Sequence, residues 1–410
     1  MGRWPARGLK PGPVAGREEN LKVFATLAYA CLLSLFYRSL ISVIAPELAT
    51  DLNLDQQQLG WLSALFFIGF AAAQIPVGVL LDRLGPRLTM SGLMGFAVIG
   101  IALVCLAPGF RLAALGQVLI GIGCAPVFTG SMMVIGRRYG EDRFGFMVSV
   151  LIVFGSLGDL LGTAPLGYLT EAIGWRWSLA GGCLLTILCL LLCFFVLAEE
   201  GPVHDQGQQT VGGLLRGMGR ILHIRGLWPI LPMALTGYAI LMVLRGLWAG
   251  PFLDGRFGLS PADRGSVLVA MSLAMAAGTF LYGLVDRLWG RRKPSVAVGA
   301  GVVALALLGL WGWGGDELWR SALLLGLVGA FAATYPVLMA HCRAFFPSEV
   351  MGRGIALMTL VNFGGVGLLQ VLSGVWMDRT GDFSGLFLAL GLVQLGALGV
   401  YLFAAERRSR

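Results

Sequence analysis

The chain contains few charged residues: Asp, Glu, Lys and Arg make up 13% of its 410 positions. It has only three His, and none lies in an H-E-x-x-H motif or at another paired spacing that could bind a metal. A G-x-x-x-x-G-K-[ST] phosphate-binding loop is also missing, and no Ser, His and Asp could assemble at one depth. These absences argue against an enzyme and against an ATP-driven motor. We therefore expect no catalytic site, cofactor or metal.

Long polar stretches are equally scarce. Hydrophobic residues make up 57% of the chain and its mean hydropathy is +0.80, which is typical of a polytopic membrane protein. A transmembrane helix needs roughly 20 apolar residues, whereas a membrane β-strand needs about ten alternating ones. The long, continuous runs favour an all-α protein with twelve transmembrane helices. These are expected near residues 21–45, 57–81, 87–107, 111–136, 145–170, 177–198, 228–250, 264–284, 295–313, 319–341, 354–376 and 384–404.

The net charge of +8 is distributed unevenly about these helices. Of the 30 Lys and Arg residues, 22 fall on the side of the N-terminus, six on the opposite side and two deep inside helices. The positive-inside rule then predicts a multi-pass protein of the cell inner (plasma) membrane with both termini in the cytoplasm. The basic residues give no support for nucleic-acid binding. The polar N-terminus carries no cleavable signal sequence, so the first helix is expected to be an uncleaved anchor.

A polar segment over 199–227 separates two similar halves, 1–198 and 228–410, each with six expected helices. The second part of this segment is expected to form a short amphipathic helix on the cytoplasmic surface. Residues of the two halves correspond at offsets of 204 to 207, which indicates an internal repeat. The pairs are Pro46 and Pro251, Gly60 and Gly265, Asp82 and Asp286, and Gly167 and Gly374.

The turn after the second helix has the pattern G-x-L-x-D-R-x-G-x-R, and a degenerate copy follows the eighth helix. With six plus six helices and a central polar segment, the chain resembles the major facilitator superfamily over nearly its whole length. The resemblance implies two pseudo-symmetric bundles that rock about a midplane site, in a monomer. It also implies a conformational latch on the cytoplasmic side, in which Asp82 takes an Arg or a helix N-terminus as partner in the outward-facing state. The corresponding residues here are Gly78, Asp82, Arg83, Gly85, Arg87, Asp286, Arg287 and Gly290.

Three charged residues lie far from any helix end: Arg38, Asp159 and Arg245. An ionisable group at membrane depth is costly and marks a candidate functional site. The two Arg are 207 positions apart, so they are repeat partners in helices one and seven. Arg38 precedes Pro46 by eight residues, about 12 Å along a helix. The guanidinium fork suits phosphate or carboxylate, which predicts an anion site.

The placement of this Arg pair resembles that in organophosphate/phosphate exchangers of the superfamily. Asp159 is expected to be the coupling residue that carries H⁺, or a fixed counter-ion, and these alternatives stay open. The glycines around Asp159 should let its helix approach a neighbour closely. A purely structural ion pair and a gating role also remain open for the Arg residues. Further cavity-facing substrate contacts are expected from polar side chains that could equally bond between helices: Tyr29, Tyr37, Gln74, Tyr238, Asn362 and Gln370.

The sequence thus predicts a secondary active transporter that works by rocker-switch alternating access in a lipid bilayer. The predicted cargo is a small organic anion, either an organophosphate or a carboxylate. One alternative is a proton-coupled efflux pump for hydrophobic or drug-like compounds. Against it, Gln117 stands where drug/proton antiporters have an Arg in helix four, and their G-P pair in helix five is absent. A further alternative is a transporter-like component of a membrane assembly or sensor.

Overall fold

The computed structural model describes residues 17–198, 224–289, 291–313, 315–346 and 351–405. Every secondary-structure element in these ranges is a helix. All seven cysteines are free thiols. The elements are α1 (Arg17–Leu52), α2 (Gln56–Cys105), α3 (Phe110–Leu161), α4 (Ala164–Ile173), α5 (Trp175–Val196), η1 (Arg225–Leu227), α7 (Leu231–Val243), η2 (Leu244–Trp248), α8 (Ala249–Phe257), α9 (Pro261–Trp289), α10 (Arg292–Trp313), α11 (Leu318–Ala332), α12 (Tyr335–Arg343), α13 (Met351–Thr380) and α14 (Phe383–Tyr401).

Eleven helices in the described ranges are long and apolar enough to cross a membrane, against the twelve expected. The difference lies in α2, whose 50 residues would measure about 75 Å if straight, far more than the roughly 30 Å of hydrocarbon in a bilayer. Gly85 interrupts α2 with a φ of 74°, a conformation that glycine adopts at little cost, and Pro86 follows it. This break falls between the expected segments 57–81 and 87–107. Of the predicted linker, 199–223 lies outside the described residues.

Asp159, the charged residue of the fifth expected helix, lies close to a second helix break. The candidate span Phe146–Ile173 includes the end of α3 and all of α4. Between them, Gly162 and Thr163 form a turn, and Pro165 occupies the first turn of α4. Proline fits there because the first N–H groups of a helix have no intrahelical partner. Asp159 therefore lies in the last turn of α3.

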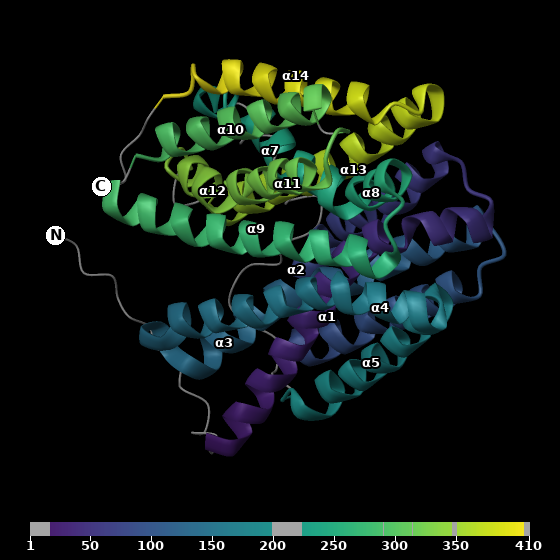
Figure 1. Cartoon of the computed structure of the whole chain (residues 1–410). Coiled ribbons are helices and arrows are strands. Elements are labelled where there is room, and N and C mark those ends of the chain that lie inside the picture. Colours follow the sequence, from purple (N-terminus) through teal and green to yellow (C-terminus); the bar gives the residue numbers. More distant parts are fainter. Residues whose placement is uncertain (1–16, 199–223, 290, 314, 347–350, 406–410) are drawn as a thin grey trace.

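The helices form two groups, α1–α5 and α7–α14, which are drawn one below the other in Figure 1. The main contacts between them are those of α2 with α13, of α4 with α9, and of α1 with η2 and α8. We call the end where α1 finishes and α2 begins the distal end, and the end where α1 begins and α14 finishes the terminal end. In Figure 1 the ribbons of the two groups approach closely at the distal end, on the right, and lie farther apart at the terminal end.

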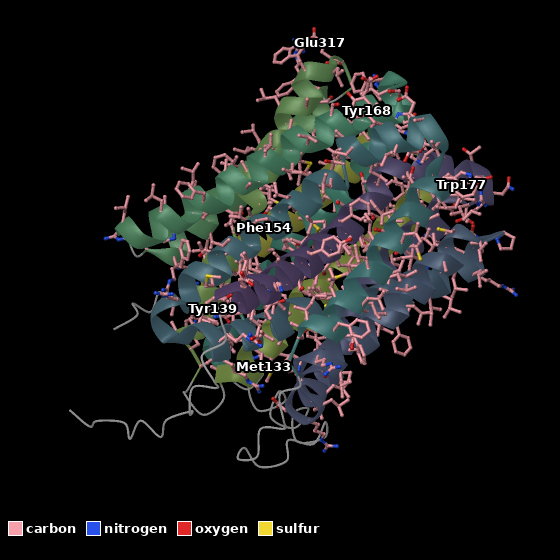
Figure 2. The ribbon with its side chains drawn as sticks, turned by 90° about the horizontal axis from the view of Figure 1, so that it is seen from below. Met133, Tyr139, Phe154, Tyr168, Trp177 and Glu317 are labelled. Carbon is pink, nitrogen blue, oxygen red and sulfur yellow. The ribbon has the colours of Figure 1, made fainter. Side chains whose placement is uncertain are left out.

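Large apolar side chains cover much of the outer surface, as a bilayer requires and a water-soluble protein avoids. Trp177 at the start of α5 is 73% exposed, and Phe154 and Tyr168 are exposed as well. Figure 2 shows Tyr168 and Trp177 toward the distal end and Tyr139 toward the terminal end. The fold is therefore that of an all-α polytopic membrane protein with two pseudo-symmetric bundles.

Candidate functional site

A buried ion pair joins the two bundles near their middle. Nη2 of Arg245 lies 2.5 Å from Oδ2 of Asp159, and the two residues are 1% and 5% exposed. Arg245 belongs to the π-helical turn η2 of the C-terminal bundle, whereas Asp159 belongs to α3 of the N-terminal bundle. Short π-helical turns inside α-helices occur frequently at functional sites. Nε of Arg245 also donates a 3.0 Å hydrogen bond to Oγ of Ser272.

Glycine brings Asp159 to this position. A Cβ atom on Gly158 would overlap the backbone of Leu32 in α1, and one on Gly162 would overlap Oγ of Ser39. The close approach of α3 to α1 that the glycines predicted is therefore confirmed. Oγ of Ser39 also donates a hydrogen bond of 3.3 Å to the backbone carbonyl of Asp159. The last turn of α3 is thereby held against α1 while the Asp159 side chain reaches the opposite bundle.

Arg38 has different surroundings from Arg245. Within the described ranges no carboxylate lies at ion-pair distance from it, and its Nε has no hydrogen-bond partner. Its Cζ instead lies 4.6 Å from the ring centre of Phe70 and 5.2 Å from that of Phe363. Phe70 comes from α2 and Phe363 from α13, so aromatic faces of both bundles flank the guanidinium. Such cation–π contacts stabilise a partly desolvated cation only modestly, by about 0.5–2 kcal/mol each.

The three charged residues meet at one cavity of about 50 Å³. A cavity this small holds a few waters but not a ligand of drug size, which needs roughly 300 Å³ or more. With two guanidinium groups and one carboxylate, its charged side chains sum to a single positive charge. Residues of both bundles line it: Leu35, Arg38, Ser156, Asp159, Tyr238, Met242, Arg245 and Met275.

The remaining predicted substrate contacts divide into two groups. Tyr238 lines the cavity, as expected for a substrate contact. The hydroxyls of Tyr29 and Tyr37 instead donate hydrogen bonds of 2.9 Å to carbonyls of α5, at Leu185 and Gly182. These two tyrosines therefore do not face the cavity in this structure, contrary to expectation.

The predicted amides also lie apart from the cavity lining. Nε2 of Gln74 donates to the carbonyl of Ala125, and Nε2 of Gln370 to that of Met242, each at 3.4 Å. Asn362 is 1% exposed, and neither atom of its amide has a hydrogen-bond partner. Both glutamines therefore form hydrogen bonds between helices, which is the alternative to substrate contact that the sequence left open.

Sequence reasoning missed Phe70 and Phe363, the two rings beside Arg38. No sequence signal separates them from the other aromatic residues, because a phenylalanine in an apolar helix is the ordinary case. It also missed a second charged contact between the bundles. Arg264 at the start of α9 is fully buried and pairs with Glu47 of α1 and with Asp254 of α8, the latter at 3.0 Å. Arg264 is the first residue of the expected helix 264–284, where a charge is ordinary, so its burial was not foreseen.

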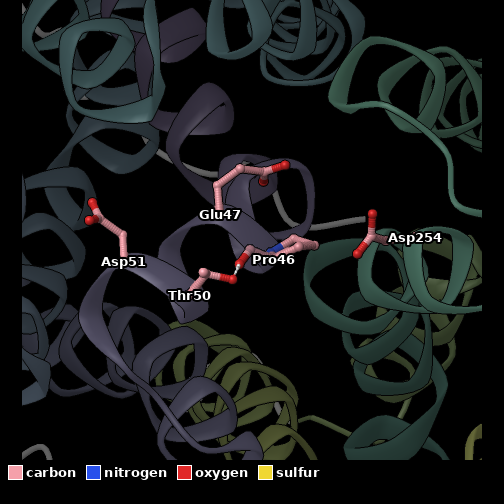
Figure 3. Close-up of a pocket in the computed structure, with 5 residues that line it drawn as sticks. All are labelled: Pro46, Glu47, Thr50, Asp51 and Asp254. Atoms are coloured by element: carbon pink, nitrogen blue, oxygen red, sulfur yellow. Dashed lines mark hydrogen bonds between the residues drawn. The ribbon is translucent and has the colours of Figure 1, made fainter.

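Glu47 and Asp254 lie at the edge of an open cavity of about 540 Å³ at the distal end. Figure 3 shows their carboxylates on either side of it, with Thr50 and Asp51 along α1. Asp51 is paired as well, with Arg176 and with Nε1 of Trp175 at 3.0 Å. Each of these carboxylates thus has a cationic partner. Of the three pairs only Glu47–Arg264 connects the bundles, because the other two lie within a single bundle.

The predicted latch residues that the structure describes lie at the terminal end. Gly85 forms the bend in α2, and the Arg87 guanidinium lies 4.6 Å from the ring centre of Phe194. Asp82 and Arg83 are exposed, and in the part of the chain that the structure describes neither forms an ion pair. A Cβ atom on Gly78 would meet no atom within 4 Å. The side chains of Asp286 and Arg287, and Gly290 as a whole, lie outside the described residues.

Comparison with known proteins agrees with this architecture. The family model of the Major Facilitator Superfamily matches residues 27–252 and 246–410. The chain is 24% identical to the hexuronate transporter of Bacillus subtilis, over 94% of this chain and 95% of that protein. It is 23% identical to a multidrug resistance protein B homolog of Mycobacterium tuberculosis, over 99% and 70%. The crystal structure of a D-xylose-proton symporter superposes with a TM-score of 0.74 at 18% identity, covering 94% of this chain and 98% of that one. The chain therefore belongs to the Major Facilitator Superfamily and is a multi-pass membrane transporter, not an enzyme.

Proposed function

We propose that this transporter carries a small organic anion by secondary active transport, with Arg38 and Arg245 as the groups that bind its charge. One observation carries the proposal: two guanidinium groups line one cavity that contains a single carboxylate. The cavity therefore has an excess positive charge, and a bound anion would neutralise it. Arg38 is the group with a free donor, because its Nε has no hydrogen-bond partner and Asp159 pairs with Arg245. The Arg38 guanidinium also bonds to the Tyr238 hydroxyl.

In this proposal Asp159 is the internal competitor of the substrate. It neutralises Arg245 and ties the bundles together while the cavity is empty. An anion that reaches Arg245, or a proton that neutralises Asp159, removes that tie. Since the pair joins α3 to η2, substrate charge and bundle position are linked through the same two side chains. This linkage supports alternating access without ATP.

We further propose that the terminal end faces the cytoplasm of a bacterial-type inner membrane. The excess of Lys and Arg on the side of the N-terminus supports this orientation. The present conformation then has its periplasmic end closed by Arg264 and its partners. Asp82 is exposed and forms no ion pair within the described residues, which fits a released cytoplasmic latch in this conformation.

Thermal unfolding of the purified full-length protein tests the proposal. The ligand panel consists of benzoate, D-glucuronate, sn-glycerol 3-phosphate, tetraphenylphosphonium and D-xylose. A ligand at about 100 times its Kd raises stability by roughly 2.7 kcal/mol, which is readily detected. We expect stabilisation by anions, and its loss in Arg38→Gln. Arg320→Gln is the matched control, since Arg320 forms an exposed pair with Glu317 three residues away.

Stabilisation by the cation or the sugar alone, unchanged in Arg38→Gln, would refute the anion proposal. The second candidate, a proton-coupled efflux pump, would then be favoured. The apolar lining by Leu35, Met242 and Met275 and the similarity to a multidrug resistance protein homolog support that candidate. If the unaltered protein binds no ligand of the panel, and a variant without all three charges keeps its fold, a role in a membrane assembly would be favoured.

A further inference from the structure

The surroundings of Arg38 narrow the class of anion, if the anion site proposed above is correct. Phe363 is the centre of an aromatic cluster that we define as Phe67, Phe70, Tyr238, Tyr335 and Phe363. Its ring centre lies 4.8 Å from that of Phe70, 5.9 Å from that of Tyr238 and 6.3 Å from that of Phe67. Phe67 and Phe70 belong to the N-terminal bundle and the other three to the C-terminal bundle. Phe70 from one bundle and Phe363 from the other thus flank the Arg38 guanidinium, whose Nε is free.

Apart from the Tyr238 hydroxyl, which accepts a hydrogen bond from the Arg38 guanidinium, the cavity offers few hydrogen bonds to a neutral polar group. Leu35, Met242 and Met275 are apolar. The hydroxyl of Ser156 already donates to the carbonyl of Ile152 at 3.0 Å. A substrate with several hydroxyl groups would lose its bonds to water here without replacing them, which disfavours its binding. An apolar or aromatic body would lose nothing and would gain ring contacts.

The charged side chains of the cavity narrow the substrate class further. The cavity carries one excess positive charge while Asp159 is ionised, so a monoanion balances it. A phosphate monoester carries about −1.5 to −2 at pH 7 and would leave the site negative. A carboxylate, in contrast, has one charge and matches the planar fork of Arg38.

From these contacts we infer that the substrate is a small monocarboxylate with an apolar, preferably aromatic, body. The carboxylate binds the Arg38 guanidinium, and the body lies against Phe363, Phe70 and Tyr238. Because these three side chains come from both bundles, the body contacts both halves at once. The flexible thioethers of Met242 and Met275 adapt to its shape as the cavity enlarges.

Calorimetric titration of the full-length protein with single probes tests this inference. Benzoate is the expected ligand, benzyl alcohol lacks its charge, and D-glucuronate keeps one carboxylate on a polyhydroxyl body. We expect benzoate to bind at least about tenfold more tightly than either of these two and than sn-glycerol 3-phosphate. In Phe363→Leu the Kd for benzoate should rise about 3- to 10-fold through loss of the ring contact. Phe387→Leu is the matched control, because Phe387 is a buried ring that packs on Phe252 away from the cavity.

The outcomes separate this inference from the anion proposal. If D-glucuronate or sn-glycerol 3-phosphate binds as tightly as benzoate, and Phe363→Leu changes nothing, the apolar-monocarboxylate inference is overturned while the anion site stands. If no anion binds but tetraphenylphosphonium or D-xylose does, both are overturned. If benzoate binds best and Phe363→Leu alone weakens it, the inference is supported. If Phe363→Leu and Phe387→Leu weaken benzoate binding equally, the proposed role of the Phe363 ring is overturned, because a general packing defect would explain both results.

Discussion

Gly60 of α2 and Gly374 of α13 meet backbone to backbone across the two bundles at the distal end. A Cβ atom on Gly60 would lie 2.7 Å from the Cα of Gly374, closer than real side chains approach. The repeat partner of Gly60 makes the matching contact: a Cβ on Gly265 would lie 2.7 Å from the Cα of Ala164. The glycines that revealed the internal repeat are therefore also the points where the bundles touch.

Gly374→Ala should disfavour the conformation closed at the distal end. The added methyl group would lie 2.9 Å from the Cα of Gly60, and backbone cannot move aside as a flexible side chain can. We expect the closed state to be destabilised by about 1–3 kcal/mol relative to the open state. Each 1.4 kcal/mol lowers the ratio of closed to open molecules roughly tenfold. Spin labels at the exposed positions Glu171 and Asp316 should then report longer distances across the distal end. Gly364→Ala on the same helix is the control, because its Cβ would meet no atom within 4 Å. Identical distance distributions in both variants would contradict the prediction.

Glu47→Gln should open the same end by a different route. Arg264 is fully buried, and Glu47 is its ion-pair partner from the opposite bundle. Removing one partner of a buried pair typically costs about 3–5 kcal/mol, less here because Asp254 remains beside Arg264. The same spin-label distance should lengthen. Arg320→Gln, which breaks an exposed pair worth at most about 1 kcal/mol, should leave it unchanged. A distance as short in Glu47→Gln as in the unaltered protein would rule out Arg264 as a tie between the bundles.

Asp159→Asn should affect stability and anion binding in opposite directions. Without a ligand, Arg245 would be buried without its counter-charge, at a cost of about 3–5 kcal/mol in unfolding free energy. With an anion, the cavity would offer two positive charges instead of one, so affinity should rise at least about tenfold. Unfolding midpoints with and without benzoate check both parts. Asp51→Asn provides the comparison, since its pair with Arg176 is partly exposed. Equal loss of stability in the two variants, or weaker anion binding in Asp159→Asn, would show that Asp159 does not compete with the substrate.

Gly78→Leu should leave the present conformation stable but prevent the opposite one. Gly78 and its repeat partner Gly283 have open space where a Cβ would be, unlike the glycines at the distal end. In alternating access the terminal end closes when the distal end opens, and a bulky side chain at Gly78 would obstruct that closure. We expect normal thermal stability, loss of transport in proteoliposomes and a narrowed distal distance distribution. Gly92→Leu on the same helix also has free space and should retain transport. Transport by Gly78→Leu at the unaltered rate would refute this role.

Several residues of the site could be predicted from the sequence, because only their depth within an apolar segment is needed to recognise them. Arg38, Asp159 and Arg245 were recognised since a charge in an apolar segment has a large cost wherever its neighbours are. The ion-pair partner of Asp159 could not be predicted. Arg38 and Arg245 were equally good candidates, and the choice depends on how α3 is rotated against α1, which Gly158 and Gly162 determine by close contact.

Orientation about a helix axis also explains the predicted contacts that lie elsewhere. Tyr29 and Tyr37 were expected at the cavity because they share α1 with Arg38, yet both bond to α5. A transmembrane helix is apolar on all sides, so its sequence carries little information on which side faces a neighbour. The number of spans shows a related effect. Hydropathy predicted two segments where α2 runs from Gln56 to Cys105, and only the backbone at Gly85 shows how they are joined.

An all-helical membrane protein with two repeated halves and three charges at membrane depth could be predicted from the amino-acid sequence. These properties follow from the transfer of each segment from water to lipid, which is a sum over its own residues. Only the packing of the helices shows that Asp159 pairs with Arg245, that Phe70 and Phe363 flank Arg38, and that Arg264 connects the distal ends of the bundles. Those contacts depend on which faces of helices far apart in the chain pack together, and packing selects faces through the shape of many side chains at once.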